Sequence, residues 1–375
     1  MMVSQFISRL KALIRKETRQ MLRDKSNVGV GLALPLVLIL LFGYGLSFDV
    51  KNSPIAVVLQ DNSSAIREVV SGLEGSQYLA PVWVGSMSEA EDLLRAGEVS
   101  GIVRIPVDFS VQQGKGNAKI QLIVNGVDSG TASAIEAYVS GAINLALQKR
   151  ADRLGTATSG AGVTLVQRTW FNEASNSTWF IVPGLIVLIM TLIGAFLTSL
   201  LIAREWERGT LESLFVTPVR PLELVISKLA PYMAVGIIDL VFCLLAAKFL
   251  FEVPMRGSLL LICFASILYL MVSLLIGLLI SGRTKNQFLA SQMALILSFM
   301  PALMLSGFVF DIRNVPVVIQ VISNILPATH FMTLIKTLFL AGNEWSMILK
   351  ECAILLFYIV LLIVATRKTL VKKLG

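Results

Sequence analysis

Long apolar runs separated by short polar segments dominate the hydropathy pattern of this chain. Six of these runs have 21 to 25 residues, and they cover residues 28–48, 179–203, 229–251, 258–281, 288–310 and 345–366. A helix needs about 20 apolar residues to cross the hydrocarbon core of a bilayer. The pattern therefore predicts an α-helical membrane protein with six transmembrane helices.

Residues 49–178 interrupt this pattern between the first and second predicted transmembrane helices. They have the mixed composition of a water-soluble domain, and their length suffices for a modest core. Short apolar runs predict strands at 54–59, 101–105 and 119–124. Helical spacing after turn or capping residues predicts helices at about 64–73, 86–96 and 131–154. Alternating strands and helices are typical of a small α/β or α+β domain.

Residues 311–342 do not have the pattern of an ordinary transmembrane helix. Pro316 and Pro327 bracket an apolar run of ten residues, and 331–340 is a second run of similar length. Each run is too short to cross a bilayer alone. Irregular backbone is tolerated at membrane depth where protein surrounds it. We therefore expect a re-entrant hairpin that enters and leaves the membrane on the outer side.

Residues 1–27 predict a basic amphipathic helix that lies on the inner membrane surface. Its basic side chains, including Arg23, lie mostly around the face opposite to its apolar residues. Glu17 projects from the apolar side, where a carboxylate is costly against lipid. Two interpretations stay open: Glu17 meets a polar or basic group of the membrane core, or it remains at the interface and extends toward water.

Residues 203–228 form a polar segment between the second and third apolar runs, and their pattern predicts a helix, a turn and a second helix. Glu205, Arg208 and Glu212 share one helical stripe. The pair 217–218, Thr-Pro, interrupts the first helix, and Pro221 is suited to begin the next. A helix at 204–217 is larger than a simple turn requires, which favours a docking surface for a cytoplasmic partner. The alternative is an ordinary solvated loop.

Composition agrees with a membrane protein, since 55% of the residues are hydrophobic, 15% are charged and the mean hydropathy is +0.77. The net charge of +8 does not indicate a nucleic-acid partner. Residues 49–178 contain ten Lys or Arg and thirteen Asp or Glu, so that the rest of the chain carries +11. The natural partners of that surplus are anionic lipid head groups.

The distribution of basic residues predicts the orientation in the membrane. Lys and Arg are concentrated in four segments, 1–27, 203–228, 282–286 and 367–373. Six crossings place all four segments on one face, and basic loops face the cytoplasm. The termini are therefore expected in the cytoplasm, and the 49–178 domain is expected outside.

The sequence contains few candidates for chemistry. No GxxxxGK[ST] phosphate loop occurs, so ATP hydrolysis would require another subunit. We expect no catalytic residue, metal ligand or bound cofactor in this chain. Asp239, near the middle of the third apolar run, is a candidate for contacting a cationic substrate, a proton or another subunit. The alternative is a hydrogen bond to a neighbouring helix. His330, the only histidine, is expected to be structural, with substrate or proton handling as the other possibility.

The polar segment resembles that of ABC-2 type exporter permeases, which carry an Arg-Glu, then Glu-Arg-Gly-Thr-Leu-Glu, then a Thr-Pro turn. The matching positions are Arg204, Glu205, Glu207, Arg208, Gly209, Thr210, Leu211, Glu212, Thr217 and Pro218, followed by Lys228 and Pro231 at the start of the third apolar run. A second match, 305–310 with Pro316, Pro327 and 339–342, is similar to the outer re-entrant segment of the family. Weaker matches are 16–17 with 23–24, and 55–64. The matches follow the family order along the whole chain.

This resemblance implies a six-span permease of a bacterial drug-efflux system in the inner membrane. It implies a homodimer or heterodimer of permeases that binds cytoplasmic ATPase subunits, which supply ATP and Mg²⁺, with 204–217 as the coupling helix. It also implies export of hydrophobic or amphiphilic substrates, drugs or lipids, and contact between the outer domain and a periplasmic adaptor. Asp239, Pro327 and His330 are the candidates for the translocation path. A different class of function, a scaffold or sensor that does not transport, remains the alternative.

Overall fold

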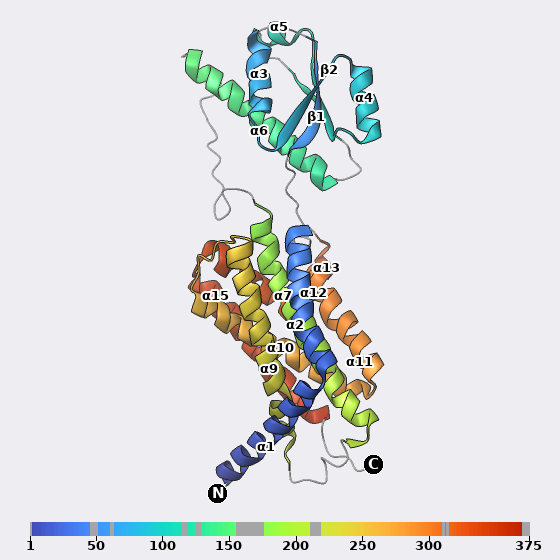
Figure 1. Cartoon of the computed structure of the whole chain (residues 1–375). Coiled ribbons are helices and arrows are strands. Elements are labelled where there is room, and N and C mark those ends of the chain that lie inside the picture. The colour runs from blue at the N-terminus through green and yellow to red at the C-terminus, as the bar shows by residue number, and fades with distance from the viewer. Residues whose placement is uncertain are drawn as a thin grey trace. The chain divides into compact units, whose positions relative to one another are not determined.

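The computed structural model describes residues 2–45, 52–60, 64–114, 119–124, 129–154, 176–210, 219–309, 312 and 315–369. The chain divides into two compact units (Figure 1). The helical unit comprises Met1–Leu46 and Thr169–Gly375, and the α/β unit comprises Ser47–Arg168.

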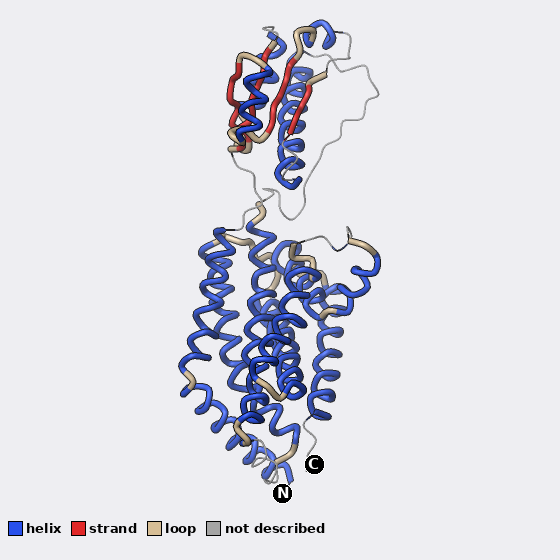
Figure 2. The backbone as a smooth tube through the Cα atoms, turned by 90° about the vertical axis from the view of Figure 1, so that its right-hand side faces the viewer, coloured by secondary structure: helices blue, strands red, loops and turns tan. Residues whose placement is uncertain are grey.

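The α/β unit is built on a four-stranded sheet with the order β2-β1-β3-β4. β1 (Ser53–Leu59) pairs in parallel with β2 (Leu79–Val84) and with β3 (Gly101–Ile105), and β4 (Gln121–Val124) is antiparallel to β3. Its helices are α3 (Ser64–Glu74), α4 (Met87–Ala96), α5 (Phe109–Gly114) and α6 (Ser129–Leu154). The helices lie on both sides of the strands (Figure 2).

Alternation along β1 explains why both faces of the sheet are covered. Ile55 and Val57 pack in a core with residues of α3, α5 and α6, whereas Ala56 and Val58 pack in a second core with residues of α4. Successive side chains of a strand point to opposite faces. A continuous apolar run such as 55–58 is therefore what a strand buried on both faces requires.

The predicted strands and helices of this unit are present, but the sequence analysis missed β2 and α5. β2 contains Pro81 and lies at the edge of the sheet, where it pairs only with β1. Proline cannot donate a ladder hydrogen bond and is tolerated on edge strands. Pro81 therefore argued against a strand at this position, and the pairing of β2 with β1 cannot be read from the local sequence.

The helical unit begins with α1 (Met2–Arg23) and α2 (Lys25–Gly45). The long helices α7 (Thr178–Glu207), α9 (Pro221–Leu245) and α10 (Leu259–Thr284) follow. The remaining helices are α11 (Gln287–Ala294), α12 (Met300–Leu305), α13 (Val317–Ile325), α14 (Pro327–Lys336) and α15 (Trp345–Thr369). Single π-helical segments extend α9 (Ala246–Leu250), join α11 to α12 (Leu295–Phe299) and extend α14 (Thr337–Ala341).

Among the described residues, five helices of this unit are long and apolar enough to cross a membrane: α7, α9 with its extension, α10, α11 to α12, and α15. The apolar part of α2 within the described residues, Gly29–Gly45, is shorter. The expected hairpin corresponds to α13 and α14, whose axes are bent by 85° at Leu326, directly before Pro327. A residue that precedes proline is disfavoured in helical conformation, which explains the break.

α7 forms the centre of the helical unit. In its most apolar window 83% of the residues are buried, against 22% for α11 to α12. α7 and α10 approach closely because Gly277 faces the backbone of Ala195 and the side chain of Thr198. Thr198 Oγ1 donates a hydrogen bond to the Leu274 carbonyl at 2.8 Å. Small residues and hydroxyl hydrogen bonds are typical of helix contacts inside membranes, and they hold α7 rigidly against α10.

Candidate functional site

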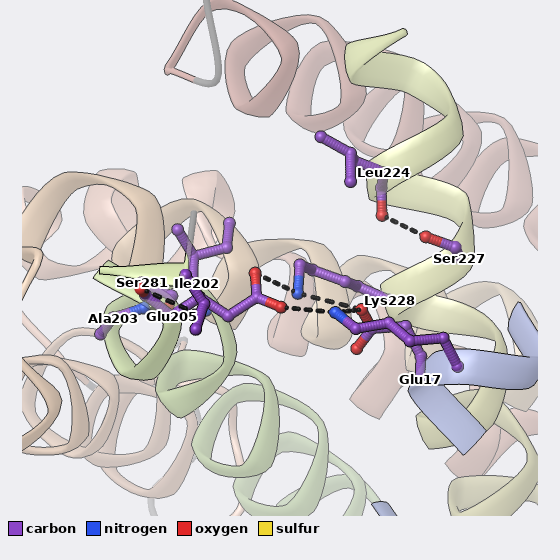
Figure 3. A network of polar contacts seen from close by, with 10 residues as sticks. Glu17, Ile202, Ala203, Glu205, Leu224, Ser227, Lys228 and Ser281 are labelled. Carbon is purple, nitrogen blue, oxygen red and sulfur yellow. Dashed lines mark hydrogen bonds and ion pairs between the residues drawn. The ribbon is translucent and has the colours of Figure 1, made fainter. Parts of the chain in front are cut away.

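Four charged side chains from three helices meet where α7 ends and α9 begins, and we call them the buried ion network: Lys16, Glu17, Glu205 and Lys228. Lys228 Nζ lies 2.7 Å from Glu205 Oε2 and 3.4 Å from Glu17 Oε1. Lys16 Nζ lies 2.9 Å from Glu205 Oε1 and 2.9 Å from Glu17 Oε1. Figure 3 shows Glu205 and Glu17 on either side of Lys228. Each lysine therefore bridges both carboxylates.

Burial distinguishes this network from a surface ion pair. The exposed fractions of Glu17, Glu205 and Lys228 are 4%, 3% and 1%. Lys16 is the member on the solvent side, since 43% of its side chain is exposed. Burial lowers the pKa of Lys16, but the charges of Glu205 and Glu17 outweigh that effect and leave this pKa above its ordinary value of 10.5. Two lysines and two carboxylates balance in charge, which is the condition under which buried charges are tolerated.

The start of α9 positions Lys228. Pro221 is the first residue of the helix, and the Glu223 carboxylate accepts a hydrogen bond at 2.9 Å from the backbone N–H of Arg220. A carboxylate in the first turn also interacts favourably with the helix dipole. Glu223 lies 3.6 Å from Arg9 Nε, which gives α1 a second ionic contact with α9.

The last turns of α7 are fixed by three neighbouring elements. Ser281 Oγ of α10 accepts hydrogen bonds of 2.9 Å from the backbone N–H groups of Ile202 and Ala203, as Figure 3 also shows. Arg204 forms an ion pair of 2.5 Å with Asp24, which lies between α1 and α2. Glu207 accepts a hydrogen bond of 2.8 Å from the backbone N–H of Gln287, at the start of α11. Motion of this end of α7 would therefore displace α1, α9, α10 and α11 together.

The structure corrects part of the interpretation of 204–217. Arg204, Glu205 and Glu207 do not begin a separate helix but complete the last turn of α7. The sequence pattern puts Glu205 and Arg208 on one helical stripe. In the structure Glu205 is buried, because its carboxylate faces Lys16 of α1 and Lys228 of α9.

The exposed part of the segment follows directly. Glu207, Arg208, Gly209 and Thr210 lie on the surface. Gly209 has φ +66, the left-handed conformation that ends helices and that glycine adopts at least cost. The predicted residues Leu211, Glu212, Thr217 and Pro218 lie outside the described residues.

The open question about Glu17 is answered, because its carboxylate meets the basic groups of Lys16 and Lys228. The family resemblance included Lys228, Lys16 and Asp24, but the sequence did not predict that they contact Glu17, Glu205 or Arg204. A usable signal existed: a carboxylate on the apolar face of a basic helix requires a buried cation, and Lys228 stands among apolar residues near the start of α9.

The three candidates for the translocation path are not brought together in one site. His330 Nδ1 lies 2.7 Å from Glu351 of α15, and its Nε2 lies 2.9 Å from the Asn324 carbonyl, so it links α14 with α13 and α15. Pro327 begins α14 at the bend. Asp239 of α9 is 2% exposed, and neither of its carboxylate oxygens has a hydrogen-bond partner among the described residues.

Comparison with known proteins adds the following findings. Residues 28–368 match the family described as ABC-2 family transporter protein. The chain is 40% identical over 337 residues to the "Probable multidrug ABC transporter permease YbhS" of Escherichia coli, an alignment that covers 89% of each chain. It is 30% identical to "Probable multidrug ABC transporter permease YbhR" of the same organism, over 88% of this chain and 90% of the relative. A third relative, "Inner membrane transport permease YhhJ" of E. coli, is 26% identical over 341 residues and 89% of each chain.

Proposed function

Because the chain belongs to the ABC-2 family of transporter proteins, we propose that it is the membrane permease of an exporter in which the movement of the end of α7 opens the transport path. An ABC permease works with an ATPase partner subunit, and this chain contains no phosphate loop of its own. The buried ion network is the observation that supports the proposed movement.

The buried ion network supports the proposed movement because it connects the exposed end of α7 with the buried parts of α1 and α9. In our proposal the ATPase contacts the exposed residues Glu207, Arg208, Gly209 and Thr210, together with the following residues up to Pro218. Glu205 and Arg204 transmit the force instead of contacting the partner, since Glu205 is buried against Lys228 and Arg204 is paired with Asp24. Separating the ion pairs of this network would leave buried charges unpaired, which is costly. We therefore expect α1, α7 and α9 to move together.

Hydrophobic or amphiphilic compounds are the proposed substrates. Two relatives carry the word multidrug in their names. Asp239 is a buried carboxylate inside an apolar helix, and none of the described residues gives it a hydrogen bond. Such groups in membrane proteins commonly mark the path of a substrate or ion. This supports a path that accepts amphiphiles with a positive charge.

The orientation and assembly are also part of the proposal. The basic segments place both termini and the end of α7 in the cytoplasm of a bacterial cell, and they place the α/β unit on the periplasmic side of the inner membrane. There it could meet a periplasmic adaptor. A dimer of two permeases is also part of the proposal, on the ground of membership in the ABC-2 family.

Charge reversal at Arg208 tests where the ATPase docks. Arg208→Glu exchanges an exposed cation for an anion, and an unfavourable charge across an interface should weaken ATPase binding by about tenfold. Arg95→Glu is the matched control, because Arg95 is an exposed arginine of the α/β unit. Co-purification of the ATPase with the tagged permease is the measurement. Equal ATPase recovery with both variants would contradict the proposed docking site.

A further inference from the structure

A basic pocket lies between α1 and the end of α7, next to the buried ion network, with which it shares Lys16. Its volume is about 720 Å³. Five of its seven lining residues are cations and only one is an acid; the lining consists of Lys16, Arg19, Gln20, Arg23, Asp24, Arg204 and Arg208. Most of the wall therefore presents side chains that donate hydrogen bonds to anions.

Within the part of the chain that the structure describes, three of the five cations of this pocket have no acidic partner. Lys16 is paired with Glu17 and Glu205, and Arg204 is paired with Asp24. No carboxylate among the described residues lies within ion-pair distance of Arg19, Arg23 or Arg208. Three guanidinium groups thus remain available, and their planar forks suit the oxygens of a phosphate group.

The surroundings of the pocket favour a ligand with an anionic head and apolar chains. α1 ends at Arg23, and α2 begins at Lys25 as an apolar helix. Val30, Val37 and Leu41 lie on one face of α2 at helical spacing and are 41%, 54% and 58% exposed. Figure 1 shows α2 following directly after α1. An acyl chain along this stripe would extend from a head group held in the pocket, which Arg23 and Asp24 line at the end of α1.

From these observations we propose that the basic pocket binds the phosphate head group of an anionic phospholipid, with its acyl chains along the exposed face of α2. Basic pockets at the cytoplasmic ends of membrane helices are known to bind anionic head groups. The bound lipid would contact α1 and α7 at the same time and would hold them together at the membrane surface. This site does not depend on the ATPase.

Removing two arginines of the pocket tests the proposal. The purified full chain, without any ATPase, is titrated in detergent with short-chain phosphatidylglycerol, with phosphatidylcholine and with inorganic phosphate. We expect saturable binding of phosphatidylglycerol and no saturable binding of the other two. Each arginine should contribute about fivefold to the affinity, so that R19Q/R23Q should bind phosphatidylglycerol about 25-fold more weakly. Lipids retained through purification, counted by native mass spectrometry, give an independent reading.

The matched control is K11Q/R15Q, which removes the same charge from the same helix at two exposed residues outside the pocket. It should change the affinity by less than about threefold. Both double variants should remain monodisperse, because none of the four side chains takes part in an ion pair among the described residues. Equal losses with both variants would overturn the proposal. It would also be overturned by tight binding of inorganic phosphate alone, or by R19Q/R23Q losing the ATPase while keeping phosphatidylglycerol.

Discussion

Two of the buried charged residues of helix α9, Lys228 and Asp239, have opposite environments. Lys228 and Asp239 are eleven residues apart and so lie on one face of the helix, separated by about 16 Å along its axis. Their exposed fractions are 1% and 2%. Lys228 contacts two carboxylates, whereas neither oxygen of Asp239 has a hydrogen-bond partner in the described part of the chain. The cost of burying a charged group is therefore compensated by ion pairs at Lys228, whereas no described residue compensates it at Asp239.

The difference separates a structural role from a functional one. Removing one member of a buried ion pair leaves its partner charged and unsolvated, so a paired charge is costly to delete. A buried carboxylate that has no ion pair does not stabilise the fold in this way. Its presence in the protein needs another explanation, such as a ligand or water that completes its hydrogen bonds. We expect mutations at the two sites to separate stability from transport.

The largest effect is expected at the buried ion network. Lys228→Met leaves Glu17 and Glu205 with a single lysine, and it should lower the free energy of unfolding by about 3–5 kcal/mol. In the double variant K228M/E205M the remaining pair, Lys16 with Glu17, is balanced, so most of this loss should be recovered. Thermal unfolding of the purified chain in detergent measures both. If the two substitutions instead destabilise additively, the network is not a charge-balanced unit.

An intermediate effect is expected where His330 joins Glu351. The side chains of His330 and Glu351 are 15% and 7% exposed, and Glu351 has a second, more distant partner in the exposed Lys350 at 3.9 Å. The contact therefore lies between the two extremes of α9. His330→Leu leaves Glu351 without this hydrogen bond and should cost about 1–3 kcal/mol in unfolding free energy. His330→Gln keeps a donor and should cost less. Equal losses in both variants would show that packing of the imidazole, and not the hydrogen bond, matters there.

The smallest effect on stability is expected at Asp239. Asp239→Asn keeps the shape of the side chain, and the unfolding free energy should stay within about 0.5 kcal/mol of the wild-type value. Export of a permanently charged amphiphilic cation should nevertheless fall, while export of a neutral analogue should not. Transport into inverted membrane vesicles that contain the ATPase measures both. A large loss of stability, or an equal loss for both substrates, would place Asp239 among the structural residues.

Much of the fold could be predicted from local pattern. Residues 101–105 form β3 as predicted, Ser86 caps α4, and Pro221 begins α9. The sequence also predicted helix α1 and the position of Glu17 on its apolar side, because helical periodicity is a property of neighbouring residues. The break at Leu326 followed from the proline after it.

The candidate site was only partly predictable. The family pattern marked Arg204 and Glu205, but it could not show that Glu205 faces inward while Arg208 faces outward. Both are acceptable on one stripe of an isolated helix, and only the packing of α1 and α9 against α7 separates them. β2 was not predicted for a similar reason, since it is formed by pairing with β1, which is distant in the sequence.

The amino-acid pattern alone therefore establishes a membrane protein with long apolar helices, an inserted α/β unit and a polar segment after α7, because each follows from periodicity and burial along a continuous stretch. The assignment of partners to Glu17, Lys228 and Asp239 required the packed structure. A charge is paired or left unpaired according to which helices meet around it, and residues 17, 205 and 228 come close only when α1, α7 and α9 have packed together.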